Sequence, residues 1–373
     1  MKQCILIPDS FKGTLSAVEF CRLGEQVIKT HLPDCRVLTI PVADGGEGTV
    51  DCFAHALQAQ RVSVEVTGPW GERVTADYAV HGDTAFVEMA QAAGLPMVGE
   101  RKDPSRTTTY GVGELIAHAA KNGSRHIVLG LGGSCTNDGG TGAAAALGVQ
   151  FFNAAGETFL PTGATMGDIV SYDTSAAKQL LRGCTLTAMC DIDNPMYGEQ
   201  GAAAIFGPQK GADPAMVKQL DENLLRLAIV MEQQSGRNIA AIPGAGAAGA
   251  FGAGVVAFLG GELRSGIETV LDCVQFDALL KDTDLVFTGE GQLDSQSLRG
   301  KVVIGVARRA KEKNVPVVAV VGAIGEGAEG AYNEGVTSVF SINRRAEDFS
   351  ISRSKTKENF TATMDSIIRL LAK

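Results

Sequence analysis

The stretch that decides the fold is 125-RHIVLGLGGSCTNDGGTGAAAALG-148. An apolar run at residues 127–131 leads into a glycine-rich loop, and an alanine-rich helix begins near Gly142, so the stretch predicts a strand, a loop and a helix. Its loop holds four small polar residues: Ser134, Thr136, Asn137 and Asp138. Glycines let backbone N–H groups approach a ligand, and a helix N-terminus favours negative charge. We expect an anion-binding turn, the alternative being a tight connection without a ligand.

Both ends of the chain alternate between apolar strands and helices. Strands are predicted at residues 4–7, 37–42, 285–288, 315–321 and 338–342. The texture changes near Arg61, where residues 62–66 and 74–80 alternate with period two, as in an antiparallel hairpin. We therefore predict an α/β protein. Residues 1–60 and 284–373 form a Rossmann-like, doubly wound parallel-sheet domain, residues 61–283 form an inserted mixed α/β domain, and the active site lies in the cleft between them.

Length and composition limit the alternatives. A chain of 373 residues is too long for a typical single core, which agrees with two domains. The net charge of −9 argues against a nucleic-acid partner. No apolar run approaches the ~18 residues of a membrane span, and the apolar segment near the N-terminus is too short for a signal peptide, so we expect a cytoplasmic protein. The eight cysteines show no C-x-x-C spacing and are expected to be reduced, buried thiols.

Polar loops follow the first two predicted strands. The first loop carries Ser10 and Lys12, and its lysine either neutralises a phosphate or lies exposed on a first helical turn. The second carries Asp44 and Glu47 among three glycines. These acids either position a hydroxyl or hold Mg²⁺, or they cap the next helix.

Three further loops carry charged groups. Asp191 and Asp193 follow a strand at 186–190 and point opposite ways in extended backbone, so one of them, with Asn194, is expected to meet the substrate. Lys210 lies in a glycine-flanked loop. The fifth loop holds acids, a hydroxyl and a lysine suited to Mg²⁺ and nucleotide phosphates: Glu290, Asp294, Ser295 and Lys301.

Two parts of the chain are similar to well-known nucleotide-binding motifs. Gly300-Lys301 lacks the upstream glycine and the following hydroxyl of a Walker A loop. The pattern Gly244-x-Gly246-x-x-Gly249 fits the dinucleotide fingerprint and supports an alternative, an NAD(P)-dependent dehydrogenase of a small hydroxy acid. Because no apolar strand ending in an acid follows it, glycine-rich helix packing is the better interpretation. A non-catalytic metabolite-binding protein is the third possibility, but it leaves the many acids unexplained.

Six segments together resemble the bacterial type 1 glycerate kinases, the glycerate 2-kinase family. They are PDSFKGTLSA, PVADGGEGTV, GLGGSCTNDGGTGAAAALG, IFGPQKGA, PGAGAAGAFGAG and TGEGQLDSQSLRGKV, in this order. The resemblance implies ATP-dependent phosphorylation of D-glycerate, most often to 2-phosphoglycerate, with Mg²⁺. Cys135 stands where a small alanine is usual, and Gln292 stands where arginine is expected. The loss of the arginine charge affects how strongly this loop binds phosphate. The partner implied is a small-molecule substrate, and the protein is a monomer or homodimer.

The roles of individual residues are inferred from their chemistry and not from the family. Nucleotide binding is expected from Ser10, Gly132, Gly133, Lys210, Glu290 and Lys301. Substrate binding is expected from Ser134, Asn137, Asp138 and Asn194, and metal binding from Asp294 and Glu47. Catalytic residues are expected to be Asp191, Asp44 and Lys12. Asp191 is the favoured base, because a rigid and partly desolvated position after a strand would raise its pKa.

Overall fold

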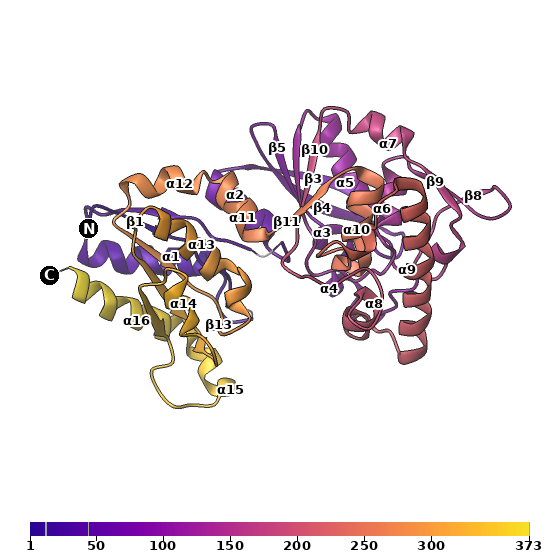
Figure 1. The fold of residues 1–373 in the computed structure, drawn as a ribbon. Helices are drawn as coiled ribbons and strands as arrows, with labels where there is room; N and C mark the ends of the chain where they lie inside the picture. Colours follow the sequence, from indigo (N-terminus) through magenta and orange to yellow (C-terminus); the bar gives the residue numbers. More distant parts are fainter. Residues whose placement is uncertain (12, 44, 373) are drawn as a thin grey trace. The chain divides into compact units, whose positions relative to one another are not determined.

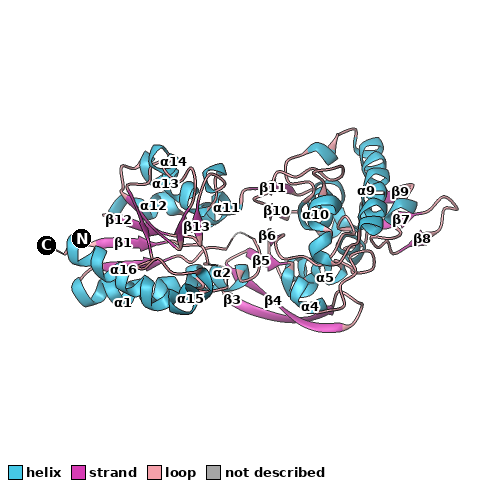
Figure 2. Cartoon of the chain, turned by 90° about the horizontal axis from the view of Figure 1, so that it is seen from below, coloured by secondary structure: helices cyan, strands magenta, loops and turns pink. Residues whose placement is uncertain are grey.

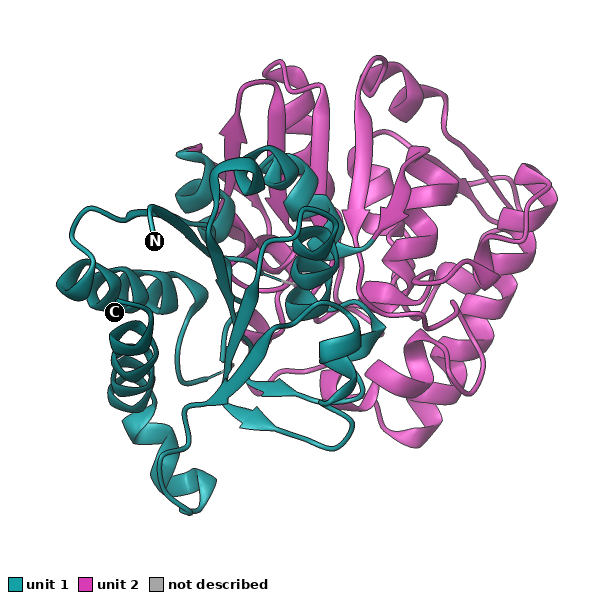
Figure 3. Cartoon of the chain, turned by 60° about the vertical axis from the view of Figure 1, so that its left-hand side comes forward, with its two compact units in different colours: residues 1–44, 51–58, 265–373 teal, residues 45–50, 59–264 magenta. Residues whose placement is uncertain are grey.

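The computed structural model describes residues 1–11, 13–43 and 45–372. The chain divides into two compact units, coloured separately in Figure 3. Unit 1 comprises residues 1–44, 51–58 and 265–373, and unit 2 comprises residues 45–50 and 59–264. In the part of the chain that the structure covers, no helix has the length and apolar character needed to cross a bilayer.

Unit 1 is built on a five-stranded, wholly parallel sheet in the order β16-β14-β12-β1-β2. Its first strand, β1, is labelled near the N-terminus in Figure 1. The strands are β1 (Gln3–Leu6), β2 (Arg36–Thr39), β12 (Leu285–Thr288), β14 (Val317–Val321) and β16 (Ser338–Ser341). Numbered along the chain, the spatial order is 2-1-3-4-5, that of flavodoxin-like doubly wound sheets. It differs from the Rossmann order of dinucleotide-binding domains. The order reverses between β1 and β12, so the loops after these two strands border the crevice where such sheets bind ligands.

Helices cover both faces of this sheet (Figure 2). On one face α1 (Ala17–His31) and α16 (Thr356–Leu371) pack through a core that includes Phe20 and Phe360. Ser16 caps α1 in a reciprocal capping box with Glu19. The other face is covered by α13 (Val302–Glu312), whose inward residues are buried aliphatic side chains.

The division between the units differs from the predicted boundary at residue 284. It falls at residue 265, so α11 (Gly266–Cys273) and α12 (Phe276–Leu279) belong to unit 1. Arg309 of α13 explains this, because its guanidinium contacts three carboxylates of these helices: Glu268, Asp272 and Asp277. The apolar pattern of these short helices carried no signal of that attachment.

Unit 2 contains a mixed six-stranded sheet in the order β11-β10-β6-β5-β4-β3. The strands are β3 (Gln60–Thr67), β4 (Arg73–His81), β5 (Thr84–Glu88), β6 (His126–Gly130), β10 (Thr185–Met189) and β11 (Glu262–Arg264). The predicted hairpin is confirmed, since β3 and β4 pair antiparallel from Gln60↔Val80 to Thr67↔Arg73. From β5 to β11 the strands are parallel. The main helices are α5 (Tyr110–Lys121), α6 (Thr141–Ala146), α9 (Pro214–Ser235) and α10 (Ala247–Leu259).

Shorter elements complete the chain. The helices are α2 (Thr49–Leu57), α3 (Ala90–Ala93), α4 (Leu95–Val98), α7 (Ser175–Leu180), α8 (Ala202–Phe206), α14 (Gly330–Asn333) and α15 (Phe349–Ser352). A small sheet contains β7 (Gln150–Phe152), β8 (Thr158–Phe159) and β9 (Ser171–Asp173), and β13 (Gln292–Leu293) pairs with β15 (Ala323–Ile324). The single-turn 3₁₀ helices lie at Met166–Asp168, Pro208–Lys210, Ile239–Ala241, Leu280–Asp282, Ser297–Arg299 and Arg353–Lys355.

Candidate active site

Two glycine-rich segments of unit 2 pack backbone against backbone at the carboxyl end of β6. Gly132 N–H donates to the carbonyl of Gly45 at 2.8 Å. A Cβ at Gly132 would lie 2.5 Å from Gly46 Cα, so only glycine permits this approach. The contact places residues 45–50 in unit 2. It also corrects the expectation for Gly132, because its N–H is used within the protein and is not presented to phosphate; Gly133 remains exposed in the same loop.

Glu88 at the end of β5 fixes this second glycine-rich segment. Its buried carboxylate accepts from Gly48 N–H at 3.2 Å and from Val50 N–H at 3.1 Å. Charge-assisted bonds of this kind are stronger than neutral ones. Glu47, predicted as a metal ligand, is exposed on the segment that Glu88 holds. Glu88 ends an apolar strand, and this position in the sequence does not predict that its carboxylate fixes another segment.

Asp138 stabilises the glycine-rich loop through hydrogen bonds within the protein. Its fully buried carboxylate accepts from Thr109 N–H at 2.9 Å, Thr109 Oγ1–H at 2.8 Å and Gly140 N–H at 3.2 Å. Burial raises the pKa of Asp138, and these hydrogen bonds oppose the rise. Asp138, predicted to bind the substrate, therefore has a carboxylate that is bonded within the loop. The N–H groups of Gly140 and Gly142 donate to it, and Gly139 N–H donates to the carbonyl of Gly249. Thr109 was missed, although the run of threonines at 107–109 marks its loop.

Lys210 is brought against this loop from a distant part of the sequence. Its ammonium is 2% exposed and donates to Ser134 Oγ at 2.7 Å and to the carbonyl of Thr136 at 2.7 Å. Desolvation lowers the pKa of Lys210 to about 8. Both of these hydrogen-bond partners are neutral, so among the described residues the buried ammonium has no directly bonded anion, which a ligand carboxylate or phosphate would supply.

Two side chains beside Lys210 carry buried polar atoms that have no hydrogen-bond partner in the described part of the chain. They are the amide oxygen and nitrogen of Asn137 and the hydroxyl of Thr136. Both residues are 0% exposed. A buried polar atom is costly unless it is bonded, so these atoms fit a ligand that brings hydroxyl and carboxylate groups. The predicted substrate residues Ser134 and Asn137 thus lie together with Lys210, which was predicted for the nucleotide.

The segment after β10 differs from its prediction. Asp191 is exposed, so the expected desolvation of this carboxylate is wrong. The side-chain amide of Asn194 donates to the backbone carbonyl of Gln200 at 2.8 Å. The backbone carbonyl of Asn194 accepts from Gly246 N–H at 2.9 Å. Asn194 therefore holds the segment together through bonds within unit 2.

The 244–249 glycine pattern serves packing. The preceding residues 239–241 form a 3₁₀ helix, where a dinucleotide fingerprint requires a strand. A Cβ at Gly249 would overlap the carbonyl of Thr136, and one at Gly254 would overlap that of Gly139. The packing interpretation is confirmed, and the pattern gives the dehydrogenase alternative no support.

Unit 1 presents a second polar cluster where its strand order reverses. Glu290, two residues beyond β12, is 5% exposed, and its Oε1 has no hydrogen-bond partner among the described residues. Burial raises the pKa of Glu290 to about 7. Ser297 and Lys301 oppose the rise, whereas Asp9 and Asp294 add to it. The loops after β1 and β12 thus place their carboxylates close enough to repel one another.

Asp294 is tied into its own loop. One carboxylate oxygen accepts from Gln296 N–H at 2.9 Å, and the other accepts from the Gln292 amide at 2.9 Å. Gln292, found where arginine was expected, therefore orients Asp294. Lys301 is exposed at the N-cap of α13, and the N–H of half-buried Ser10 donates to Asp9 at 2.6 Å.

The unit 1 cluster fits Mg²⁺. The described residues contain no group of three metal-ligating side chains. Mg²⁺ at phosphate-transfer sites takes one or two carboxylates, completing its shell with water and phosphate oxygens. Glu290, with a buried oxygen that lacks a partner, is a better candidate than Asp294, whose oxygens already accept hydrogen bonds. Glu47 belongs to unit 2, and the predicted catalytic residues Lys12 and Asp44 lie outside the described residues.

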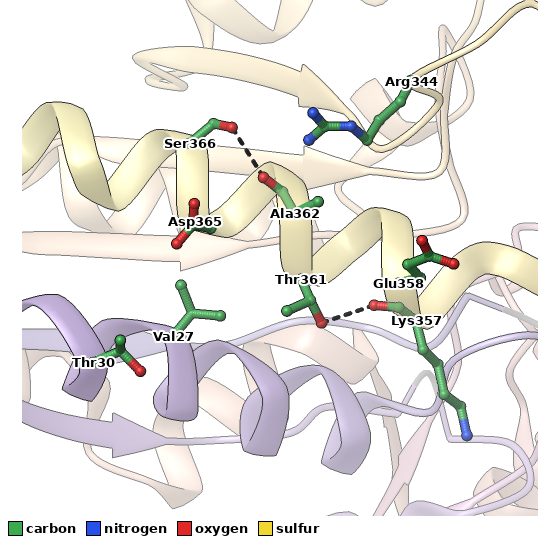
Figure 4. A pocket seen from close by; sticks show the side chains of 9 residues that line it. All are labelled: Val27, Thr30, Arg344, Lys357, Glu358, Thr361, Ala362, Asp365 and Ser366. Atoms are coloured by element: carbon green, nitrogen blue, oxygen red, sulfur yellow. Dashed lines mark hydrogen bonds between the residues drawn. The ribbon is translucent and has the colours of Figure 1, made fainter.

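A hollow of about 670 Å³ lies on unit 1 between α1 and α16 (Figure 4). Two of its charged lining residues are paired within the unit, because Asp365 contacts His31 and Arg369, and Lys357 contacts Glu19. No predicted site residue lines it. The polar loops at the sheet edges remain the candidate site.

Comparison with known proteins gives one consistent result. A sequence model described as the glycerate kinase family matches residues 4–372. A protein of Halalkalibacterium halodurans named glycerate kinase is 44% identical over 345 residues, which cover 92% of this chain and 91% of the relative. A protein of Escherichia coli named glycerate 2-kinase is 43% identical over 341 residues, 91% of this chain and 90% of its own. A crystal structure assigned to a glycerate kinase 2 of Salmonella typhimurium superposes with a TM-score of 0.87 at 41% identity, covering 99% of this chain and 98% of that one.

Proposed function

The chain belongs to the glycerate kinase family, and we therefore propose that it transfers the γ-phosphoryl group of ATP to D-glycerate. The 2-hydroxyl is the proposed acceptor, since a relative is named glycerate 2-kinase. The reaction consumes one ATP and one glycerate and releases ADP and 2-phosphoglycerate.

The observation that carries the proposal is the buried ammonium of Lys210. Glycerate is a small anion with two hydroxyl groups. Its carboxylate supplies the negative charge that the neutral partners of Lys210, Ser134 and Thr136, do not. Its hydroxyls satisfy the amide of Asn137, which has no partner among the described residues. Lys210 was predicted from the sequence to bind the nucleotide, and we propose instead that it binds glycerate.

The nucleotide is proposed to bind unit 1, at the crevice beside β1 and β12. Lys301 and the Ser10 loop contact phosphate oxygens, and Glu290 with Asp294 holds Mg²⁺. When bound, Mg²⁺ neutralises charge on the transferring phosphates. Asp294 keeps its loop in place through its bonds to Gln292 and Gln296.

The base stays a prediction. Asp191 is proposed to accept the proton of the attacking hydroxyl, with Asp44 as the alternative and Lys12 as a charge on the transferring phosphate. The active-site cleft between the two domains is likewise still a prediction. Asp191→Asn keeps the size of the side chain and removes its basicity, so kcat should fall at least 100-fold with little change in KM. Near-normal kcat in Asp191→Asn beside an inactive Asp44→Asn would transfer the role to Asp44.

The test of the activity is a coupled assay on the purified chain. ATP consumption should require both Mg²⁺ and D-glycerate, and ³¹P NMR should identify 2-phosphoglycerate. Formation of 3-phosphoglycerate would move the acceptor to the other hydroxyl. Reduction of NAD without ATP use would favour the dehydrogenase, and glycerate binding without turnover would favour a metabolite-binding protein.

A further inference from the structure

The glycine-rich segment at residues 243–254 contains a left-handed turn. Ala248, Gly249 and Ala250 have φ/ψ of 55°/43°, 66°/41° and 68°/18°. Two of these residues are alanines, for which this conformation is sterically disfavoured. Three consecutive residues in it are unusual, because left-handed residues normally occur singly. Strain of this kind persists only where the surrounding structure holds it, and it concentrates at functional sites.

The turn and its flanking glycines contact both segments that carry predicted substrate residues. Gly249 accepts from Gly139 N–H at 3.0 Å, and its Cα faces Thr136 and Asn137 so closely that a Cβ would lie 2.5 Å from Asn137 Cα. Gly246 donates to the carbonyl of Asn194 at 2.9 Å. A Cβ at Gly244 would lie 2.7 Å from Cys190 Sγ, directly before Asp191.

Phe251 of the same segment packs against the glycine-rich loop. Phe251, directly after the turn, lies so close to Gly140 that a Cβ there would lie 2.9 Å from its ring atom Cε2. Phe251 is 0% exposed, so its ring cannot move aside into solvent. Asn137 therefore lies between the left-handed turn and Asp138, and its amide atoms have no hydrogen-bond partner in the part of the chain that the structure covers.

We propose that Gly249 is a positioning residue: the left-handed turn at 248–250 holds the Thr136–Asn137 backbone so that the Asn137 amide and the Lys210 ammonium meet glycerate together. This inference rests on the proposed function. It assigns a role to a glycine pattern that otherwise resembles a nucleotide fingerprint. The turn acts through Asn137 and does not touch the substrate.

The decisive variant is Gly249→Ala, with Gly260→Ala as its matched control. Both glycines have φ of +66° and belong to α10 or its C-cap, so both variants carry the same left-handed backbone cost. A Cβ at Gly260 meets nothing within 4 Å, whereas one at Gly249 overlaps the glycine-rich loop. The expected result is a rise of at least tenfold in KM for D-glycerate in Gly249→Ala, with KM for ATP within twofold of wild type. Gly260→Ala should keep both KM values.

Equal KM values for glycerate in Gly249→Ala and wild type would overturn the proposal, as would an equal rise in Gly260→Ala. Phe251→Leu is the milder second variant, used if Gly249→Ala does not fold, and it should raise KM for glycerate at least threefold; an unchanged KM contradicts the proposal. The wild-type assay separates the two claims. A wild-type chain that does not phosphorylate glycerate refutes the proposed function, whereas an active wild type with an unaffected Gly249→Ala refutes only the positioning role.

Discussion

Lys210 in unit 2 and Glu290 in unit 1 are both buried charged groups, and the same cause shifts their pKa values in opposite directions. Desolvation lowers the pKa of the Lys210 ammonium to about 8 and raises that of the Glu290 carboxyl to about 7. Lys210 is bonded to neutral oxygens, and Glu290 keeps an oxygen without a partner among the described residues. Among the described residues, the Lys210 ammonium is therefore not hydrogen-bonded to an anion, and Glu290 Oε1 is not bonded to a cation, although Asp138 and Lys301 act on them at longer range.

This contrast is the basis of the proposed division between the two reactants. In that proposal, the glycerate carboxylate binds at Lys210 and the metal-bound phosphate binds at Glu290. The local structure agrees with this division. The unit 2 loop is fixed by backbone packing and by Asp138, which suits a small rigid acid. The unit 1 loop is fixed by side chains such as Gln292 and is more exposed, which suits a larger and charged ligand.

The largest effect is expected from Lys210→Met. Removing the ammonium deletes a charge-assisted contact in a buried site, worth roughly 3 kcal/mol or more. We expect kcat/KM for glycerate to fall about 100-fold, with the thermal midpoint at or above that of wild type, because a costly buried charge is lost. Steady-state kinetics and thermal melting check this. A variant with wild-type kcat/KM would remove Lys210 from the site.

The two buried groups should also give opposite pH dependences of stability. Between pH about 4.5 and about 7 the folded chain keeps a proton on Glu290 that the unfolded chain loses, so the free energy of unfolding falls with rising pH. Between pH about 8 and about 10.5 the unfolded chain keeps a proton on Lys210 that the folded chain loses, so Lys210 contributes a rise in the free energy of unfolding. Above pH about 9 the thiols of Cys135 and Cys190, whose pKa values are raised by burial, contribute a fall. The contributions of Glu290 and Lys210 are each on the order of 3 kcal/mol.

Glu290→Gln should reduce the acidic slope of that profile, to which Asp138 also contributes because burial raises its pKa, and Lys210→Met should remove the contribution of Lys210 above pH about 8. Thermal melts of the two variants and wild type across both ranges measure this. A variant that keeps its slope would show that another group titrates there.

A smaller kinetic effect is expected from Glu290→Gln. The amide keeps the shape of the side chain and weakens its hold on Mg²⁺, so the Mg²⁺ concentration for half-maximal rate should rise about tenfold, or ~1.4 kcal/mol. KM for glycerate should stay within twofold. If KM for glycerate rises and the Mg²⁺ requirement does not, Glu290 contributes to glycerate binding and its assignment to Mg²⁺ is wrong.

The smallest effect concerns structure alone. Arg309→Met removes a guanidinium that contacts Glu268, Asp272 and Asp277, whereas the neighbouring Arg308 is paired with Glu334. A partly exposed ion cluster contributes about 1 kcal/mol, so the midpoint should drop by about 2–4 °C. Arg308→Met should lose less. Equal losses in the two variants would mean that the attachment of α11 and α12 does not depend on the charge cluster.

The sequence predicted the strands of the unit 1 sheet, the hairpin and the position of the polar loops, because apolar periodicity and glycine content are local signals. It did not predict the short strands β7, β8, β9, β11, β13 and β15. It missed what depends on contacts between distant residues. From the sequence, Asp138 is predicted to bind a ligand, but in the structure its carboxylate accepts a hydrogen bond from Thr109. From the sequence, Lys210 is predicted to bind phosphate, but in the structure its ammonium donates to Ser134. Asp191 was expected to be desolvated because its strand is buried, yet the chain leaves the sheet at that point and exposes it.

Proton uptake on glycerate binding tests the central claim most directly. D-glycerate is titrated calorimetrically into wild type and Lys210→Met at pH 8.5–9, in buffers of different ionisation enthalpy. If the carboxylate binds at the Lys210 ammonium, the pKa of Lys210 rises on binding. Wild type should then take up between half a proton and one proton per glycerate, by the order-of-magnitude titration of a group with its pKa near 8, and Lys210→Met should take up none. Glycerate binding without proton uptake, and with unchanged affinity in Lys210→Met, would contradict the account.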